Sequence, residues 1–347
     1  MTIQILEPTD KAIELAVQRL KDGFVIGLPT ETVYGLAADA SNPVAVNRIY
    51  KAKDRPNNHP LIVHVRQAQE NEDWLAVLAP WAREVCPPAF ALAQAFWPGP
   101  LTMILPRAKG VIDEVTGGQD TVGIRCPNHP VAQAILKSFK GGLAAPSANR
   151  FGRISPTAAQ HVKDEFLGHL DELIILDGGS CSVGIESTIV DLCHWDTIGP
   201  IILRPGLITQ NQVEITTGLR VGEKPAITVR HSGGMAAHYA PRTVLFLAND
   251  VSKHLTEQHL DQAPPSSLVK IAWVSMDRPQ FPQSSSIQLE FYPFPRTPSQ
   301  AAQILYQLLR DLDAQSYTHL VFPELPATIE WAGIRDRLGR AAVGSGT

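Results

Sequence analysis

The length, composition and charge of the chain predict a folded protein of two domains. It has 347 residues, 44% hydrophobic and 18% charged, which is enough apolar material for a full core and too much chain for one small domain. Its 25 glycines and 28 prolines are scattered among apolar runs, which excludes a disordered or collagen-like chain. The net charge of −4 argues against a protein that coats nucleic acid by bulk electrostatics.

Targeting and redox signals indicate a soluble, cytoplasmic protein that does not associate with membranes. No apolar stretch approaches the roughly 20 residues that cross a bilayer, and the N-terminus lacks the basic head and apolar run of a signal peptide. The four cysteines, Cys86, Cys126, Cys181 and Cys193, show no CxxC spacing. We therefore expect reduced, mostly buried thiols rather than a zinc or redox site.

Helical and strand patterns alternate through the first 209 residues. Apolar periodicity and capping residues predict helices at 9–21, 43–51, 81–96, 130–139 and 156–166. Short apolar runs predict strands at 24–28, 61–65, 101–105, 122–124, 143–145, 173–176, 188–192 and 201–203. Strands mixed with helices in this way indicate an α/β domain over residues 1–209.

The second part of the chain predicts a linker and a smaller α/β domain. Residues 210–241 have short polar runs with several glycines and read as a linker. Residues 242–347 offer strands at 244–247, 269–274, 287–291 and 318–322, and helices at 298–312 and 329–342. This pattern indicates a Rossmann-like domain, although it contains no glycine fingerprint for a nucleotide.

Polar residues gather where the predicted strands of the first domain end. The segment 29–35 follows a buried strand, where α/β sheets place ligands, although a plain loop with threonines capping backbone groups is the alternative. Lys51, Lys53 and Arg55 then suit a polyphosphate, or else form a solvated helix end. His64 lies in a strand whose alternation turns it away from the side of Leu61, and alone it carries little weight.

A basic stretch in the middle of the domain is a candidate anion site. No acidic residue lies between Asp120 and Asp164. The basic residues of this stretch are Arg125, Lys137, Lys140, Arg150, Arg153 and Lys163. Ser147 follows a short strand, and Ser155 precedes a proline as a helix N-cap does, so either hydroxyl suits a phosphate or simply caps backbone.

Seven segments in this order resemble the YrdC-like family. They are PTETVYGL at 29–36, KDRP at 53–56, PLIVH at 60–64, WPGPLT at 97–102, APSAN at 145–149, ESTIVD at 186–191 and RPG at 204–206. The linker ending HYAP at 238–241, followed by a further domain, is similar to the two-domain long form of the family. The resemblance implies a YrdC-like twisted, open mixed sheet with helices, plus a smaller Rossmann-like α/β domain at the C-terminus.

The activity that the resemblance implies is a nucleotidyl transfer that makes threonylcarbamoyl-AMP. L-threonine, bicarbonate or CO2, and ATP, expected with Mg²⁺, would give threonylcarbamoyl-AMP and pyrophosphate. Other proteins of the tRNA threonylcarbamoyl-transfer machinery would then modify the adenosine next to the anticodon, so this chain would meet tRNA only indirectly or weakly. A carbamate attacking the ATP α-phosphate needs no covalent protein nucleophile.

The resemblance also assigns residues by position. The threonine-binding positions are Thr32, His64, Arg125, Ala145 and Ser187. The ATP-binding positions are Lys53, Arg55, His59, Thr121, Ser147, Asn149, Ser155, Arg204 and Tyr239, the last of which would close over the nucleotide from the linker. Asp54 stands where the family commonly has glycine, His59 where asparagine is frequent, and Ala236 and Ala237 where basic residues are usual.

Two other functions remain as alternatives at this stage. An RNA-binding module without catalysis is disfavoured by the acidic first domain and by the lack of aromatic-rich basic strands. The YrdC-like domain of the hydrogenase-maturation carbamoyltransferase makes a related carbamoyl adenylate. That protein carries zinc-binding cysteine pairs and further domains, which this chain lacks.

Overall fold

A computed structural model describes residues 2–70, 72–224, 229–258, 260, 268–280 and 286–346. The chain divides into two units: Met1–Phe151 with Ser155–Gly234, and Gly152–Ile154 with Met235–Thr347. Most of the predicted linker therefore belongs to the first unit, and its residues 225–228 lie outside the described part of the chain. Each unit is described by itself.

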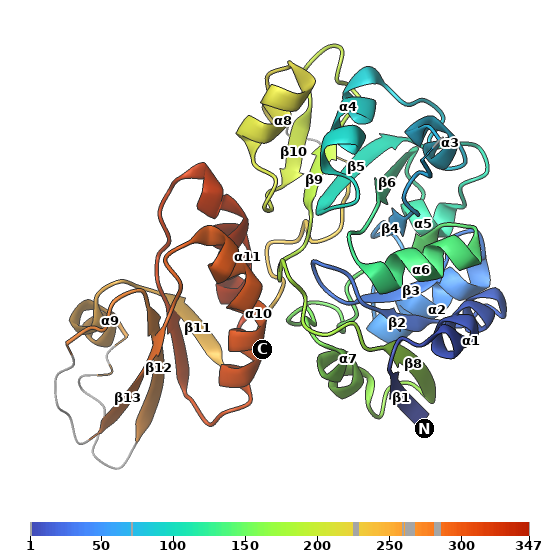
Figure 1. The fold of residues 1–347 in the computed structure, drawn as a ribbon. Helices are drawn as coiled ribbons and strands as arrows, with labels where there is room; N and C mark the ends of the chain where they lie inside the picture. Colours follow the sequence, from blue (N-terminus) through green and yellow to red (C-terminus); the bar gives the residue numbers. More distant parts are fainter. Residues whose placement is uncertain are drawn as a thin grey trace. The chain divides into compact units, whose positions relative to one another are not determined.

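A mixed sheet forms the centre of the first unit, with the strand order β1-β8-β2-β3-β7-β4-β6-β5-β9-β10 (Figure 1). Its strands are β1 (Thr2–Leu6), β2 (Ile26–Leu28), β3 (Gly35–Asp39), β4 (Ile62–His64), β5 (Leu101–Pro106), β6 (Thr121–Arg125), β7 (Leu143–Ala144), β8 (Glu172–Leu176), β9 (Thr188–Asp191) and β10 (Ile201–Arg204). β4 runs parallel to β6, and β5 runs antiparallel to β6 and parallel to β9. Strands distant in sequence are thus neighbours in the half of the sheet that carries most of the candidate site.

Helices cover the two faces of this sheet unequally. α1 (Asp10–Lys21) and α6 (Pro130–Phe139) share one apolar cluster with Ala37 of β3. The opposite cluster takes Leu36 and Ala38 from the same strand, as the alternation of side chains requires. It also takes buried residues of α2 (Pro43–Lys53), α3 (Trp74–Leu78), α4 (Pro87–Phe96), α5 (Asp113–Thr116), α7 (Ala159–Phe166) and α8 (Gln210–Thr217).

The structure corrects several predicted boundaries. The helix predicted from residue 81 begins at Pro87, because two successive prolines occupy its first turn and a residue before proline disfavours helical geometry. The helix predicted from Pro156 begins at Ala159 with Ala158 as its N-cap. The strands β1 and β3, and the helix α8 within the predicted linker, were not expected.

The second unit is a parallel four-stranded sheet with helices. Its strands are β11 (Val244–Leu247), β12 (Val269–Ser275), β13 (Ile287–Pro293) and β14 (His319–Phe322), in the order β11-β14-β12-β13. α9 (Val251–Glu257) packs in one cluster with Trp273 and Val321. α10 (Pro298–Asp313) packs beside α11 (Ala332–Gly344), which follows the short helix η2 (Ile329–Trp331). The predicted fold class, a mixed α/β domain with a second, smaller α/β domain, is confirmed.

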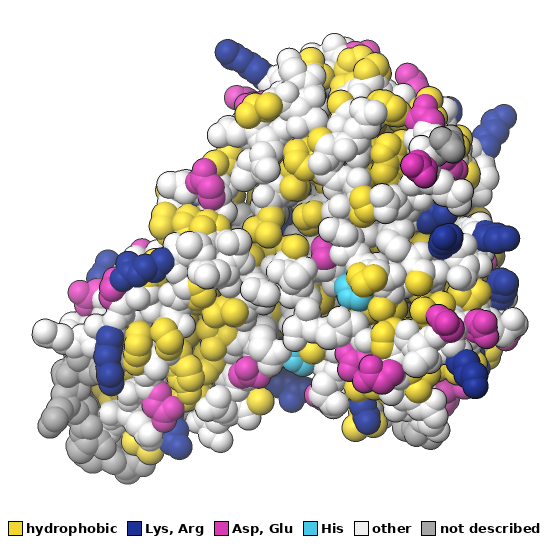
Figure 2. All heavy atoms as spheres, viewed as in Figure 1, with side chains coloured by type: hydrophobic (Ala, Val, Ile, Leu, Met, Phe, Trp, Pro, Cys, Tyr) yellow, Lys and Arg dark blue, Asp and Glu magenta, His cyan; other side chains and the backbone are white. Residues whose placement is uncertain are grey.

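The structure also describes the surface charges, the cysteines and the length and apolar character of the helices. On the face shown in Figure 2, the coloured lysine and arginine side chains lie interspersed with acidic ones. All four cysteines are free, and three of them are buried, as predicted. Within the described residues, no helix has both the length and the apolar character needed to cross a membrane.

Candidate functional site

Three polar side chains form a row across adjacent strands of the first unit. In the sheet register, His64 of β4 is paired with Arg125 of β6, and Arg125 with Thr102 of β5. Directly paired residues project their side chains from the same face of a sheet, so the imidazole, the guanidinium and the hydroxyl lie side by side. All three residues are buried. His64 and Arg125 end their strands, which places this row at a strand-end edge, as the sequence predicted.

Ser187 extends this row toward Arg204. The hydroxyl oxygens of Thr102 and Ser187 are 2.7 Å apart. The Arg204 guanidinium donates to the Ser187 carbonyl over 3.0 Å and to its hydroxyl over 3.1 Å. Gly206 lets the chain return closely, because a Cβ there would lie 2.6 Å from the Thr188 backbone nitrogen. The two motifs at 186–191 and 204–206 thus meet in one hydrogen-bonded group.

Glu31 reaches Arg125 from the loop between β2 and β3. A Glu31 carboxylate oxygen lies 2.7 Å from the Arg125 Nη2 atom, and each side chain is only 5% exposed. In the same loop, the hydroxyl oxygens of Thr30 and Thr32 are 3.0 Å apart, and both residues are buried. The 29–36 motif therefore brings a buried charge as well as hydroxyls to the row.

His64 is held as a neutral imidazole. Burial first, and the neighbouring Arg125 charge second, lower its pKa to about 3. Its Nδ1 atom lies 3.2 Å from the Ile62 carbonyl oxygen, which can only accept a hydrogen bond. In the neutral ring Nδ1 therefore carries the proton, and Nε2 is left as an acceptor.

Lys53 joins the end of α2 to the loop that follows β7. Its Nζ atom donates to the Ser147 carbonyl over 2.6 Å and also to the Asn149 carbonyl. Complete burial, followed by the charge of Arg55, holds the pKa of Lys53 well below its ordinary value. Ala145, at the start of the same loop, donates its backbone N–H to the Ile62 carbonyl over 3.1 Å. These contacts bring the predicted positions 53, 147 and 149 together and place position 145 next to β4.

Other predicted phosphate-binding residues lie around the same loops. Arg55 donates to the Pro60 carbonyl over 3.0 Å, and its guanidinium is 6.0 Å from the centre of the Phe151 ring. The His59 ring packs edge to face against the Phe151 ring, and the two ring centroids are 5.5 Å apart. Ser155 does not cap a helix as the sequence suggested, because α7 begins four residues later. Its hydroxyl instead donates to the Glu186 carboxylate over 2.6 Å.

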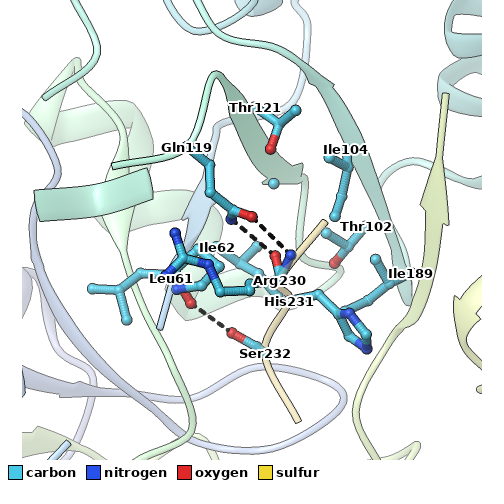
Figure 3. A pocket seen from close by; sticks show the side chains of 12 residues that line it. Leu61, Ile62, Thr102, Ile104, Gln119, Thr121, Ile189, Arg230, His231 and Ser232 are labelled. Carbon is cyan, nitrogen blue, oxygen red and sulfur yellow. Dashed lines mark hydrogen bonds between the residues drawn. The ribbon is translucent and has the colours of Figure 1, made fainter. Parts of the chain in front are cut away.

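A segment of the predicted linker lies in the pocket on this face of the sheet. The pocket is lined by residues that include Ile62, Thr102, Thr121, Gly123 and Ile189 from four neighbouring strands (Figure 3). The same pocket is lined by Arg230, His231 and Ser232, and the cavity left is about 10 Å³, the room of a single water.

The Gln119 side chain holds the segment 230–232 in place through hydrogen bonds to the Arg230 backbone. Figure 3 shows the Arg230 backbone N–H donating to the Gln119 side-chain carbonyl over 2.7 Å, while the Gln119 amide donates to the Arg230 carbonyl over 3.1 Å. The Ser232 hydroxyl donates to the Pro60 carbonyl over 3.0 Å, and Arg204 donates to the Ser232 carbonyl over 3.1 Å. The segment 230–232 is therefore tied to both sides of the pocket.

Comparisons with known proteins identify the family. A family model described as telomere recombination, covering Sua5, YciO and YrdC, matches residues 18–206. A model of the threonylcarbamoyl-AMP synthase C-terminal domain matches residues 208–343. The threonylcarbamoyl-AMP synthase of Bacillus subtilis is 35% identical over 355 residues, which cover 98% of this chain and 95% of that protein. The chain belongs to the threonylcarbamoyl-AMP synthase family.

Further relatives agree with this membership. The threonylcarbamoyl-AMP synthase of Pyrococcus abyssi is 40% identical over 235 residues, 66% of this chain and 65% of that protein. A crystal structure of P. abyssi Sua5 complexed with L-threonine is 30% identical and superposes with a TM-score of 0.81 over 99% of this chain and 98% of that one. Members of this family are nucleotidyltransferases, and the two-domain form is the one that this chain matches.

Tyr239 belongs to the second unit, and the other assigned residues to the first. It is buried, with its ring centre 5.5 Å from that of Tyr306 and 5.5 Å from the Arg337 guanidinium. Its φ of 62° is unusual for a bulky side chain, which marks a strained backbone in the HYAP motif of the family.

Asp54 of the first unit also lies in the left-handed region, with a φ of 51°. Glycine adopts this conformation without steric cost, which fits the glycine that the family resemblance predicts at this position.

Sequence reasoning missed three residues of the site. Glu31 and Thr102 lie inside quoted family motifs, so their positions carried a signal, but their partners are 94 and 85 residues away along the chain. Gln119 stands outside every motif, and no sequence signal points to its contact with Arg230. No group of three or more histidine, cysteine or acidic residues that could hold a metal ion occurs among the residues that the structure describes.

Proposed function

We propose that this protein makes threonylcarbamoyl-AMP and pyrophosphate from L-threonine, bicarbonate or CO2, and ATP. The observation that carries the proposal is the row of His64, Arg125 and Thr102, continued by Ser187 to Arg204. One end of this row offers an arginine for a carboxylate, and the other reaches the residues assigned to ATP.

The threonine end of the row suits a hydroxy amino acid. The Arg125 guanidinium has the fork geometry that pairs with a carboxylate. The neutral His64 ring offers an acceptor at Nε2, and Thr32, Thr102 and Ser187 supply buried hydroxyls. In the proposed reaction the threonine ammonium loses a proton to solvent, and the amine then bonds to the carbon of CO2 as a C–O π bond opens and a second proton leaves to solvent. An oxygen of the resulting carbamate attacks the ATP α-phosphate as its bond to pyrophosphate breaks. Positioning and charge neutralisation suffice for this step.

The ATP end of the row suits a triphosphate. Arg55 and Arg204 supply positive charge, and the Lys53 amino group donates to the backbone of the loop at Ser147 and Asn149. His59, Thr121, Ser155 and Tyr239 complete the positions assigned to ATP by the family resemblance. We expect Mg²⁺ to arrive bound to the ATP phosphates, because Mg²⁺ is usually held by substrate phosphates and a few carboxylates.

ATP entry requires the segment 230–232 to move. The hydroxyl and carbonyl of Ser232 engage Pro60 and Arg204, and the remaining cavity is too small for any substrate group. Displacement of Ser232 would release one contact of Arg204, whose guanidinium could then turn to a phosphate.

The cellular setting of the proposed reaction follows from the family. We propose that proteins of the tRNA threonylcarbamoyl-transfer machinery receive the product in the cytoplasm, and that tRNA meets this chain only indirectly. The domain limits 1–209, 210–241 and 242–347 also stay predictions.

The deciding experiment is pyrophosphate release from ATP by the full chain, with and without L-threonine and bicarbonate. We expect release that requires both substrates and falls at least 100-fold in Arg125→Ala. Arg66→Ala is the matched control, because Arg66 also pairs with a glutamate of this unit, Glu72, over 2.5 Å. Release that is indifferent to threonine would refute the proposed acceptor, and absence of release would favour the RNA-binding module instead.

A further inference from the structure

We propose that Glu31 is a specificity-determining residue, whose carboxylate cancels the charge of Arg125 so that the amino acid site at Arg125 selects a zwitterionic amino acid over a plain carboxylate. The inference rests on the proposed function, since it takes the Arg125 end of the row as the amino acid site. It adds a charged residue that the family positions do not include.

The contact between Glu31 and Arg125 is built into the fold. The carboxylate and guanidinium are 2.7 Å apart, with 5% of each side chain exposed. The Glu31 carbonyl also accepts the backbone N–H of Val183 over 2.7 Å, which fixes its loop to the segment that leads to Ser187. A buried ion pair fixed from two sides is not a mobile surface contact, so Glu31 stays beside Arg125 when a ligand arrives.

Arg125 can hold a second carboxylate while it holds Glu31. A guanidinium has five N–H donors, and the contact with Glu31 involves a single nitrogen, Nη2. The incoming carboxylate is then attracted by Arg125 and repelled by Glu31 at nearly the same distance. Its net attraction is therefore much smaller than for an arginine alone.

Within the group formed by Glu31, Arg125 and His64, the charges sum to zero. Arg125 and Glu31 cancel, His64 is neutral, and Thr32, Thr102 and Ser187 carry hydroxyls. Arg204, beyond Ser187, faces the proposed triphosphate. When it binds, before its amine reacts with CO2, threonine brings both charges, whereas a ligand without an ammonium group would place an uncompensated negative charge in this buried site.

The test compares two ligands of the same shape on the full-length protein. (R)-3-hydroxybutyrate is threonine without its amino group, and calorimetry gives the dissociation constant of each ligand. We expect the wild type to prefer threonine by about 100-fold, and Glu31→Gln to reduce this preference by at least about tenfold. The ratio cancels any uniform loss of binding from altered packing.

Glu72→Gln serves as the matched control. It removes the same charge from another arginine–glutamate pair of the unit, that of Glu72 with Arg66, and leaves the preference unchanged. Glu31→Asp, which keeps the carboxylate, retains the preference.

The outcomes separate this inference from the proposed function. Threonine binding with an unchanged preference in Glu31→Gln overturns the role of Glu31 and leaves the proposed function standing, whereas a wild type that binds no threonine removes both. If Glu31→Gln does not fold, the wild type and Glu31→Asp decide whether the inference holds. A wild-type preference below tenfold, or its loss in Glu31→Asp, overturns the inference.

Discussion

Replacing Gln119 with alanine should release the segment 230–232 from one side of the pocket without unfolding the domain. The substitution removes both hydrogen bonds to the Arg230 backbone. The remaining contacts of the segment stay in place: the Arg230 guanidinium on the Gly117 carbonyl, and Ser232 on Pro60 and Arg204. Opening is therefore expected to be local.

The size of this effect follows from the two lost bonds. Each contributes about 1 kcal/mol net, so together they stabilise the closed segment by about 2 kcal/mol. That free energy corresponds to opening that is roughly 30-fold more frequent in the variant. The same two bonds stabilise the folded chain against unfolding, so the free energy of global unfolding should fall by no more than about 2 kcal/mol, because the core contacts are unchanged.

Amide hydrogen exchange measures this opening directly. The Arg230 amide, which loses its acceptor Gln119 in the variant, should exchange at least about 30-fold faster there. Gln18→Ala is the control, because Gln18 of α1 makes a side-chain hydrogen bond to the C-cap residue Asp22, and α1 packs against β2, β3 and β8 rather than against the strands that line the pocket. Unchanged exchange over residues 229–232, or equal acceleration in the control, would refute the reasoning.

Two further predictions concern the row of polar side chains. The pKa of His64 is about 3 in the folded protein and 6.5 ordinarily. As the pH falls, His64 is therefore protonated in the unfolded chain before it is protonated in the folded protein. Its contribution to stability is complete above pH 6.5 and is lost as the pH falls toward 3, with about 2 kcal/mol gone by pH 5. Urea unfolding at pH 7 and pH 5 should show a smaller loss in His64→Asn than in the wild type, and equal losses would contradict the assignment. Thr102→Val removes the hydroxyl that contacts Ser187 and should raise the KM for threonine about tenfold while leaving the KM for ATP unchanged. Steady-state pyrophosphate release distinguishes this result from an equal rise in both constants.

The amino-acid sequence by itself determined much of the local structure. Apolar spacing and an N-cap predict α1, and Asn42 with Pro43 predicts the start of α2, because a helix and its cap are formed by residues a few positions apart. Alternation along β4 predicts that Ile62 and His64 lie on the face opposite Val63, and the separate apolar clusters of Ile62 and Val63 confirm this for these two residues. The family motifs likewise marked most of the loops that form the site.

The tertiary structure alone decided which of these residues meet. Arg125 contacts Glu31 although β3, β7 and β4 lie between β2 and β6 in the sheet, so this contact depends on the path of the loop after β2 and on strand pairing between distant segments. Ser155 illustrates the limit: it has the sequence of an N-cap, yet its hydroxyl is bonded to Glu186. Residues 230–232 read as linker but lie in the pocket, because Gln119, 111 positions away, binds their backbone. Local propensity cannot encode such contacts, since their free energy exists only once the sheet has formed.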